Sequence, residues 1–146
     1  MFTNEMYAKI ANNTTTAIFG ENQFPLDYSV THEEEPNGDY VKSTTFSGSF
    51  YPANLICDVF VEFEERNFTT PQKDTYVKFA CYFRTKDGKS LEATVLEVYD
   101  AKNRTPLQLE NLMITAFLHF TLEHPTLFDP LRRDFSDALN ADEIEF

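Results

Sequence analysis

The sequence contains no tryptophan, only four glycines and only two cysteines among its 146 residues. So little glycine argues against the phosphate-binding loops of dinucleotide-binding proteins and P-loop nucleotide hydrolases. Two cysteines outside a C-x-x-C arrangement cannot form a disulfide-rich secreted scaffold. No apolar run approaches the ~18 residues of a membrane-spanning helix. Because residues 1–6 also lack the basic start and apolar stretch of a signal peptide, we expect a soluble, cytoplasmic protein without membrane partners.

Basic residues are scarce as well, with 12 Lys and Arg against 24 Asp and Glu, so the formal net charge is -12. The excess acid lies at the two ends of the chain. Residues 1–40 contain seven acids and one base, and residues 105–146 contain eight acids and two bases. Such a field repels nucleic-acid phosphate and attracts basic partners. Acidity also serves solubility, and the sequence leaves both explanations open.

Apolar and aromatic residues are plentiful, at 42% and 15% of the chain. This length and composition can bury a core, so we expect one domain over 1–146, with an acidic C-terminal tail at 139–146. The predicted fold class is α+β. It comprises an antiparallel meander sheet of about four to six strands, a long C-terminal helix packed on one face, a short N-terminal helix and a second short C-terminal helix.

Alternating apolar residues predict three strands, at 55–64, 76–84 and 91–99. Asp87-Gly88 is typical of a two-residue hairpin turn. Closing the hairpin on that turn pairs Val77 with Val98, Lys78 with Glu97 and Phe79 with Leu96. For the preceding strands we expect the pairs Glu62–Lys78, Val59–Cys81 and Val61–Phe79, although a slip of two residues would preserve the same faces.

Local signals predict the remaining elements. An earlier hairpin has strands at 26–31 and 40–46 around a turn at 32–39, and Ser47-Gly48-Ser49 is expected to break the second strand. A helix at 4–11, capped by Thr3, is expected to end at the Asn and Thr residues of 12–16.

The long helix is predicted at 106–123, because Thr105, Pro106 and Gln108 form a capping box with proline at the first helical position. Asp129-Pro130 is expected to begin another helix. The long helix has a first apolar stripe, formed by Leu109, Leu112, Met113, Ala116, Phe117 and Phe120. A second stripe of Ile114, Leu118 and Leu122 is either internal or an oligomer contact.

One face of the predicted meander is not plainly polar. Phe60, Tyr82 and Val95 lie on it, with Ala80 and Leu91, beside a row of Glu62, Lys78 and Glu97. Either the N-terminal segment or another chain is expected to cover this face. Phe60, Tyr82 and Val95 are therefore a candidate apolar contact surface.

No catalytic, cofactor-binding or metal-binding residue is predicted, and we expect the chain not to be an enzyme. Asp58 and Glu62 share a strand face, but Lys78 and Arg84 would neutralise them. Both cysteines are expected in the core as small apolar residues.

The favoured interpretation is a non-enzymatic, acidic protein-binding module. It would inhibit or occlude a basic, nucleic-acid-handling protein rather than bind nucleic acid directly. The candidate partner-binding residues lie in a turn and in the tail: Glu33, Glu34, Glu35, Asp142, Glu143, Glu145 and Phe146. A structural subunit of a virion or another oligomeric assembly is an alternative, in which the chain forms a homo-oligomer.

A third interpretation comes from the C-terminal residues. The run Asp142-Glu143-Ile144-Glu145-Phe146 resembles the acidic, Phe-terminated tails of bacterial and phage single-stranded-DNA-binding proteins. In that family the tail docks partner proteins, and the resemblance implies single-stranded nucleic-acid binding by the domain. Tyr76, Tyr82 and Phe60 beside Lys78 and Arg84 would then form a stacking platform.

Overall fold

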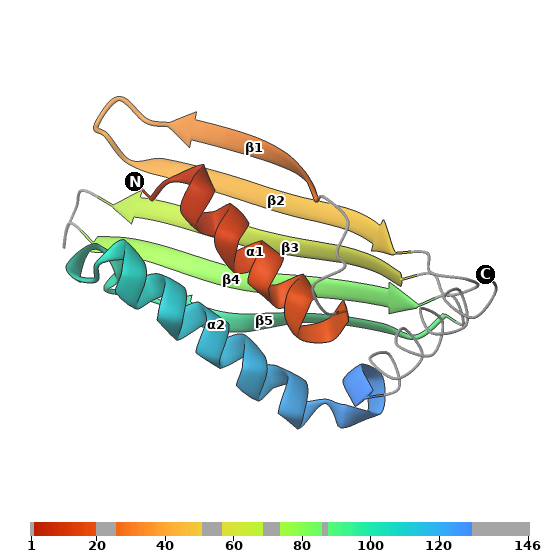
Figure 1. Cartoon of the computed structure of the whole chain (residues 1–146). Coiled ribbons are helices and arrows are strands. Elements are labelled where there is room, and N and C mark those ends of the chain that lie inside the picture. Colours follow the sequence, from red (N-terminus) through yellow and green to blue (C-terminus); the bar gives the residue numbers. More distant parts are fainter. Residues whose placement is uncertain (1, 20–25, 51–56, 69–73, 86–87, 130–146) are drawn as a thin grey trace.

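Five strands in the described part of the chain form one antiparallel sheet in the order β1-β2-β3-β4-β5, with two long helices against one face (Figure 1). The computed structural model describes residues 2–19, 26–50, 57–68, 74–85 and 88–129. In chain order, the elements are α1 (Asn4–Phe19), β1 (Asp27–Glu34), β2 (Tyr40–Phe50), β3 (Cys57–Phe68), β4 (Asp74–Thr85), β5 (Ser90–Val98), η1 (Ala101–Asn103) and α2 (Pro106–Glu123). Residues 125–129 are also helical. The predicted α+β meander is confirmed.

The N-terminal helix α1 is longer than predicted, since it runs through the Asn and Thr residues to Phe19. Thr3 caps it as expected, because its hydroxyl accepts a hydrogen bond from the Met6 amide at 3.2 Å. Within the helix, the Thr14 hydroxyl donates to the Ile10 carbonyl at 2.9 Å and is buried with Thr15. The predicted end at 12–16 is wrong because these hydroxyls bond to the helix backbone instead of competing with it.

The expected break at Ser47-Gly48-Ser49 is also wrong, since β2 continues to Phe50 and pairs with β3 throughout. Ser49 lies opposite Asp58, and its hydroxyl donates to the Asp58 carboxylate at 2.6 Å. Pairing with β3 along the whole segment, and with β1 at Ser47, stabilises residues whose composition alone favours a turn.

The register between β3 and β4 is shifted by two residues from the predicted register. Lys78 lies opposite Glu64, Val61 opposite Cys81 and Phe63 opposite Phe79. The expected pairs Glu62–Lys78, Val59–Cys81 and Val61–Phe79 are therefore wrong, although every side chain keeps its predicted face. Extending β3 to Phe68 lengthens the ladder, and the cross-sheet charge row becomes Glu64, Lys78 and Glu97.

Between β4 and β5 the predicted pairs of Val77, Lys78 and Phe79 are confirmed. The predicted two-residue turn is wrong, because Thr85 bonds to Lys89 and the Gly88 amide donates to the Thr85 carbonyl at 3.1 Å. Gly88 has φ 88, as expected for the residue that closes a three-residue hairpin loop. The extra residue is absorbed by a bulge that leaves Val95 without a partner between Leu96 and Thr94.

The long helix α2 spans the predicted residues. The Thr105 hydroxyl accepts from the Gln108 amide, and the Gln108 side chain accepts from the Thr105 amide, which completes the capping box. The first apolar stripe supplies the buried residues Leu109, Met113, Phe117 and Phe120. The second stripe faces outward, with Leu118 45% and Leu122 72% exposed.

Both helices lie on the same face of the sheet. Tyr7 of α1 stacks on Phe63 of β3 at 4.7 Å, and Phe117 of α2 lies 6.3 Å from Phe79 of β4, measured between ring centroids. Lys9 and Glu110 join the helices through an ion pair of 3.1 Å. No described helix covers the opposite face of the sheet (Figure 1). None of the helices in the described ranges is long and apolar enough to cross a membrane.

Candidate functional site

Among the described elements, the edge strand β1 is the most exposed. All eight of its residues are exposed, including Tyr28 at 64% and Val30 at 38%. It pairs with β2 on one side only, and it lies beyond α1 at the rim of the sheet (Figure 1). An edge strand that no described element covers presents both faces and one row of backbone groups to a partner.

Carboxylates are concentrated on this edge. Glu33 and Glu34 end β1, Glu35 follows them, and Asp27 begins the strand. All four residues are exposed, and none of their carboxylates forms an ion pair with another described residue. The structure thus brings the three predicted turn residues together as an exposed group. They lie mostly in a strand rather than in the expected turn at 32–39.

The hairpin of β1 and β2 contains one basic residue, Lys42, and the fold removes it from the surface. Lys42 is 6% exposed, and its ammonium donates to the Phe2 carbonyl at 3.1 Å. It also lies 5.6 Å from the centroid of the Tyr7 ring. Because Lys42 is committed to the interior, the edge keeps its full negative charge.

A buried carboxylate beside Lys42 was not identified from the sequence. Glu65 of β3 has no exposed surface, and its Oε1 accepts from the Phe2 amide at 3.0 Å and the Tyr7 hydroxyl at 2.7 Å. The Tyr40 hydroxyl donates to the other oxygen. Continuing the alternation of β3 past Glu64 would have placed Glu65 on the core face. This cluster anchors the start of α1 and the start of β2 on the sheet.

The uncovered face of the sheet carries the aromatic pair that the sequence suggested. Phe60 and Tyr82 are cross-strand partners with ring centroids 5.8 Å apart, and Phe60 is 43% exposed. Val95 does not complete this surface. At the bulge it is half-buried and packs against the core, and the shifted register also turns Leu91 toward the core. The predicted contact face therefore reduces to Phe60 and Tyr82.

Charges on the uncovered face are largely paired. The Arg84 guanidinium lies 2.8 Å from the Asp58 carboxylate, and Lys78 and Arg66 lie 3.9 and 3.3 Å from Glu64. A hydrogen bond from Ser49, followed by the contact with Arg84, holds the pKa of Asp58 below its usual value. Cations that are paired in this way attract phosphate weakly.

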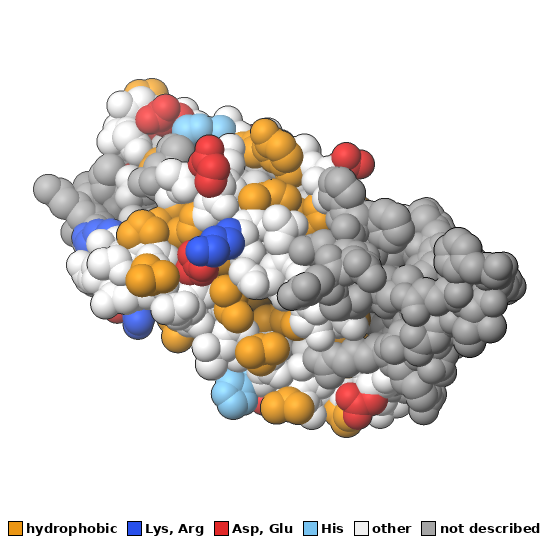
Figure 2. All heavy atoms as spheres, in the orientation of Figure 1, with side chains coloured by type: hydrophobic (Ala, Val, Ile, Leu, Met, Phe, Trp, Pro, Cys, Tyr) orange, Lys and Arg blue, Asp and Glu red, His pale blue; other side chains and the backbone are white. Residues whose placement is uncertain are grey.

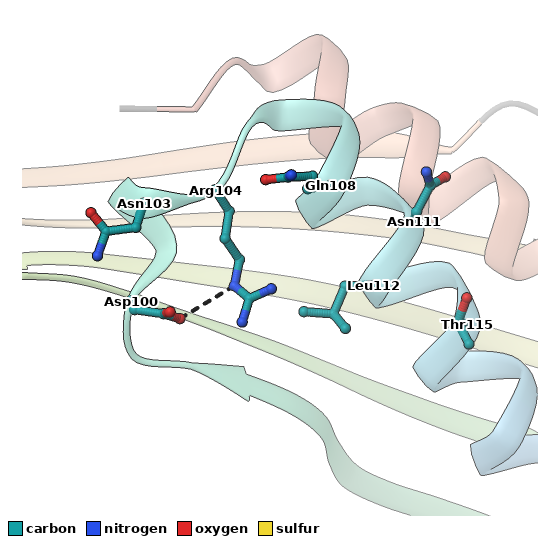
Figure 3. A pocket seen from close by; sticks show the side chains of 7 residues that line it. All are labelled: Asp100, Asn103, Arg104, Gln108, Asn111, Leu112 and Thr115. Atoms are coloured by element: carbon teal, nitrogen blue, oxygen red, sulfur yellow. Dashed lines mark hydrogen bonds and ion pairs between the residues drawn. The ribbon is translucent and has the colours of Figure 1, made fainter.

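A hollow of about 620 Å³ lies at the start of α2. It is lined by Asp100, Asn103, Arg104, Gln108, Asn111, Leu112 and Thr115 (Figure 3). Arg104 Nε lies 3.2 Å from Asp100 Oδ1, and Gln108 belongs to the capping box. The hollow is wide and open. Two of its polar side chains, Arg104 and Gln108, already bond to Asp100 and Thr105 near the start of α2.

Cysteine and histidine form no recognisable centre in the described ranges. Cys81 is buried as predicted, and burial raises the pKa of its thiol to about 12, which leaves little reactive thiolate at neutral pH. The side chain of Cys57 lies outside the described residues. Within the described part of the chain, no group of three His, Cys, Asp or Glu residues is placed to hold a metal ion.

Two further surfaces considered from the sequence are the outer apolar stripe of α2 and the C-terminal tail. Leu107, Leu118 and Leu122 are exposed on α2, but the helix-bearing side of the molecule shows separate hydrophobic groups rather than one large patch (Figure 2). The tail residues Asp142, Glu143, Glu145 and Phe146 lie outside the described residues. The expected start of a helix at Asp129-Pro130 is wrong, because residues 125–129 are already helical and the Phe128 amide donates to the His124 carbonyl at 3.1 Å.

The chain matches no protein-family model, no curated protein and no solved structure. Its function is therefore inferred from these surfaces alone.

Proposed function

We propose that the chain is a non-enzymatic protein-binding domain that holds a basic surface of its partner against the acidic edge of its sheet. The observation that carries the proposal is the exposed edge formed by β1 and Glu35, whose four carboxylates have no described cation beside them. Such a site would inhibit or occlude a partner whose basic surface normally contacts nucleic acid.

Charge arrangement supports a protein partner over nucleic acid. The net charge of -12 repels phosphate, and the cations of the uncovered face are already neutralised by Asp58 and Glu64. An acidic edge attracts lysine and arginine over several ångströms and accelerates association with a basic protein. Association should therefore weaken as salt rises, because the Debye length falls from about 10 Å at 0.1 M to about 3 Å at 1 M.

The test compares two charge-reversed variants that change the net charge equally. The edge variant is Glu33→Lys with Glu34→Lys and Glu35→Lys. The control carries Glu→Lys changes at Glu62, Glu92 and Glu123, three carboxylates outside β1. The wild type and both variants are used to capture proteins from the source cells, and the captured protein is then purified for calorimetry.

We expect the wild type and the control variant to retain one basic protein that the edge variant loses. The Kd for that protein should rise with salt. Capture of a neutral or acidic protein, or equal retention by the two variants, would contradict the proposal.

A structural subunit is the second candidate, favoured by the exposed Leu118 and Leu122 on a helix with few charges. Sedimentation velocity of the purified chain tests it. An oligomer that Leu118→Glu dissociates would favour assembly through α2. A monomer at high concentration would contradict the structural-subunit candidate, and the protein-binding proposal would then be the remaining one.

A further inference from the structure

The outer edge of β1 combines three properties: a backbone that no described strand pairs with, a short apolar segment and carboxylates. We infer that the partner supplies an extended basic segment that adds to β1 as a sixth strand. This inference rests on the proposed function, and it specifies both the chemistry of the ligand and its mode of binding.

The backbone direction of β1 follows from its turn. The Glu35 amide donates inward to the Asp39 carbonyl at 2.7 Å. Amides alternate along an antiparallel pair, and β1 pairs with β2 without interruption. The amides and carbonyls of Tyr28, Val30, His32 and Glu34 therefore point outward, where no described strand pairs with them.

The side chains of β1 define which residues the added strand should carry. On the helix-bearing side lie Tyr28 and Val30, which can pack against apolar residues of a neighbouring strand. On the uncovered side lie Asp27 and Glu33, which can pair with lysine or arginine. A segment that alternates apolar and basic residues matches both faces at once.

A small hollow adds to the apolar side of the edge. It has a volume of about 150 Å³ and is lined by Asn4, Glu5, Ala8, Tyr28 and Phe46. Asn4 Oδ1 is buried and has no hydrogen-bond partner among the described residues. The hollow thus offers mainly apolar walls to a side chain that reaches over Tyr28.

Charge argues against a second copy of the chain as the added strand. Facing residues of an antiparallel pair lie on the same side of the sheet, so a two-fold pairing of β1 with itself centres on Val30 or on Thr31. Asp27 would then lie opposite Glu33 or Glu35 of the second copy. Like charges directly opposite each other destabilise a strand pair. The same carboxylates that favour a basic segment therefore oppose self-pairing at this edge.

The experiment uses the full chain and an eight-residue peptide of alternating valine and lysine, which matches the length of β1. Two control peptides carry glutamate in place of each lysine, or a central proline. Affinities are measured by fluorescence anisotropy, and the contacted amides are mapped by NMR. Val30→Pro removes one outward amide while leaving all carboxylates, and Ser29→Ala on the same strand is the matched control.

We expect the basic peptide to bind, with shifts and exchange protection at the amides of Tyr28, Val30 and His32. Val30→Pro should raise its Kd about tenfold, the value of about one lost hydrogen bond, while Ser29→Ala leaves it unchanged. The proline peptide should bind the wild-type chain as weakly as the basic peptide binds Val30→Pro. This second comparison uses only the wild-type chain, so it does not depend on whether a variant folds.

Equal, salt-sensitive binding of the basic and proline peptides would overturn strand addition and leave the proposed acidic surface intact. Binding of the glutamate peptide as tightly as the lysine peptide, or no binding of the lysine peptide, would overturn the inferred ligand. The capture experiment would then decide the proposed function by itself. A dimer of the free chain that Val30→Pro dissociates would assign the edge to self-pairing.

Discussion

The buried carboxylate of Glu65 makes a strong prediction about stability. It accepts hydrogen bonds from the Phe2 amide and from the hydroxyls of Tyr7 and Tyr40. Tyr7→Phe removes one of these donors and nothing else. The ring remains stacked on Phe63 at 4.7 Å, so the change creates no substantial cavity.

The expected cost follows from the type of bond that is lost. A hydrogen bond to a charged group contributes about 1.5–3 kcal/mol, and Tyr7 is 1% exposed, so water does not replace its hydroxyl. We expect the free energy of unfolding to fall by that amount. Urea unfolding at pH 7 measures it, provided that the m-value is unchanged.

Tyr28→Phe is the matched control, because Tyr28 is 64% exposed and stacks on Phe46 without a side-chain hydrogen bond in the described residues. Its free energy of unfolding should stay within about 0.5 kcal/mol of wild type. Equal costs for the two variants would refute the role assigned to Glu65.

The same variant has a signature at alkaline pH. Burial, followed by the charge of Glu65, raises the pKa of Tyr7 well above its usual value of 10.0, and the pKa of Tyr40 is raised for similar reasons. The unfolded chain therefore loses these protons first. Stability is fully present below pH 10 and falls above it, by at most about 1.4 kcal/mol per pH unit for each tyrosine. Tyr7→Phe should remove one such contribution, and an unchanged slope above pH 10 would contradict the coupling.

Three other measurements test the core, the helix start and the thiol. Phe117→Ala should lower the free energy of unfolding by about 3–5 kcal/mol, whereas Leu122→Ala, at an exposed position, should lower it by under about 0.5 kcal/mol. Similar losses for the two variants would contradict the orientation of α2 on the sheet. Thr105→Ala should cost about 1 kcal/mol through loss of the capping box, measured by thermal melting. In a Cys57→Ser background, Cys81 should react with a thiol reagent at pH 8 only as fast as the chain unfolds, and rapid labelling would contradict its burial.

The elements with strong local signals could be predicted closely. Thr105, Pro106 and Gln108 fix the start of α2, because a capping box satisfies backbone donors within four residues. Alternation assigned the faces of β3 and β4, since side chains on a strand point to opposite sides in turn. These features need no knowledge of distant residues.

Register and element ends could not be predicted in the same way. A two-residue slip between β3 and β4 leaves every face unchanged, so only the full set of tertiary contacts selects the pair Glu64–Lys78. The bulge at Val95 depends on how the three-residue loop closes. The extension of α1 to Phe19 depends on the burial of Thr14, Thr15 and Ile18, which composition does not reveal.

For the candidate site, the sequence by itself determined the charges, and the tertiary structure decided which of them a partner can meet. Glu33, Glu34 and Glu35 are adjacent in the chain, so their negative charge was evident at once. Only the fold places them beside a strand edge that no described element covers, and only the fold buries Lys42 under α1. The physical reason is that the exposure of a residue depends on what packs over it. The helices α1 and α2 lie over β2 to β5, and the residues of β1 stay exposed.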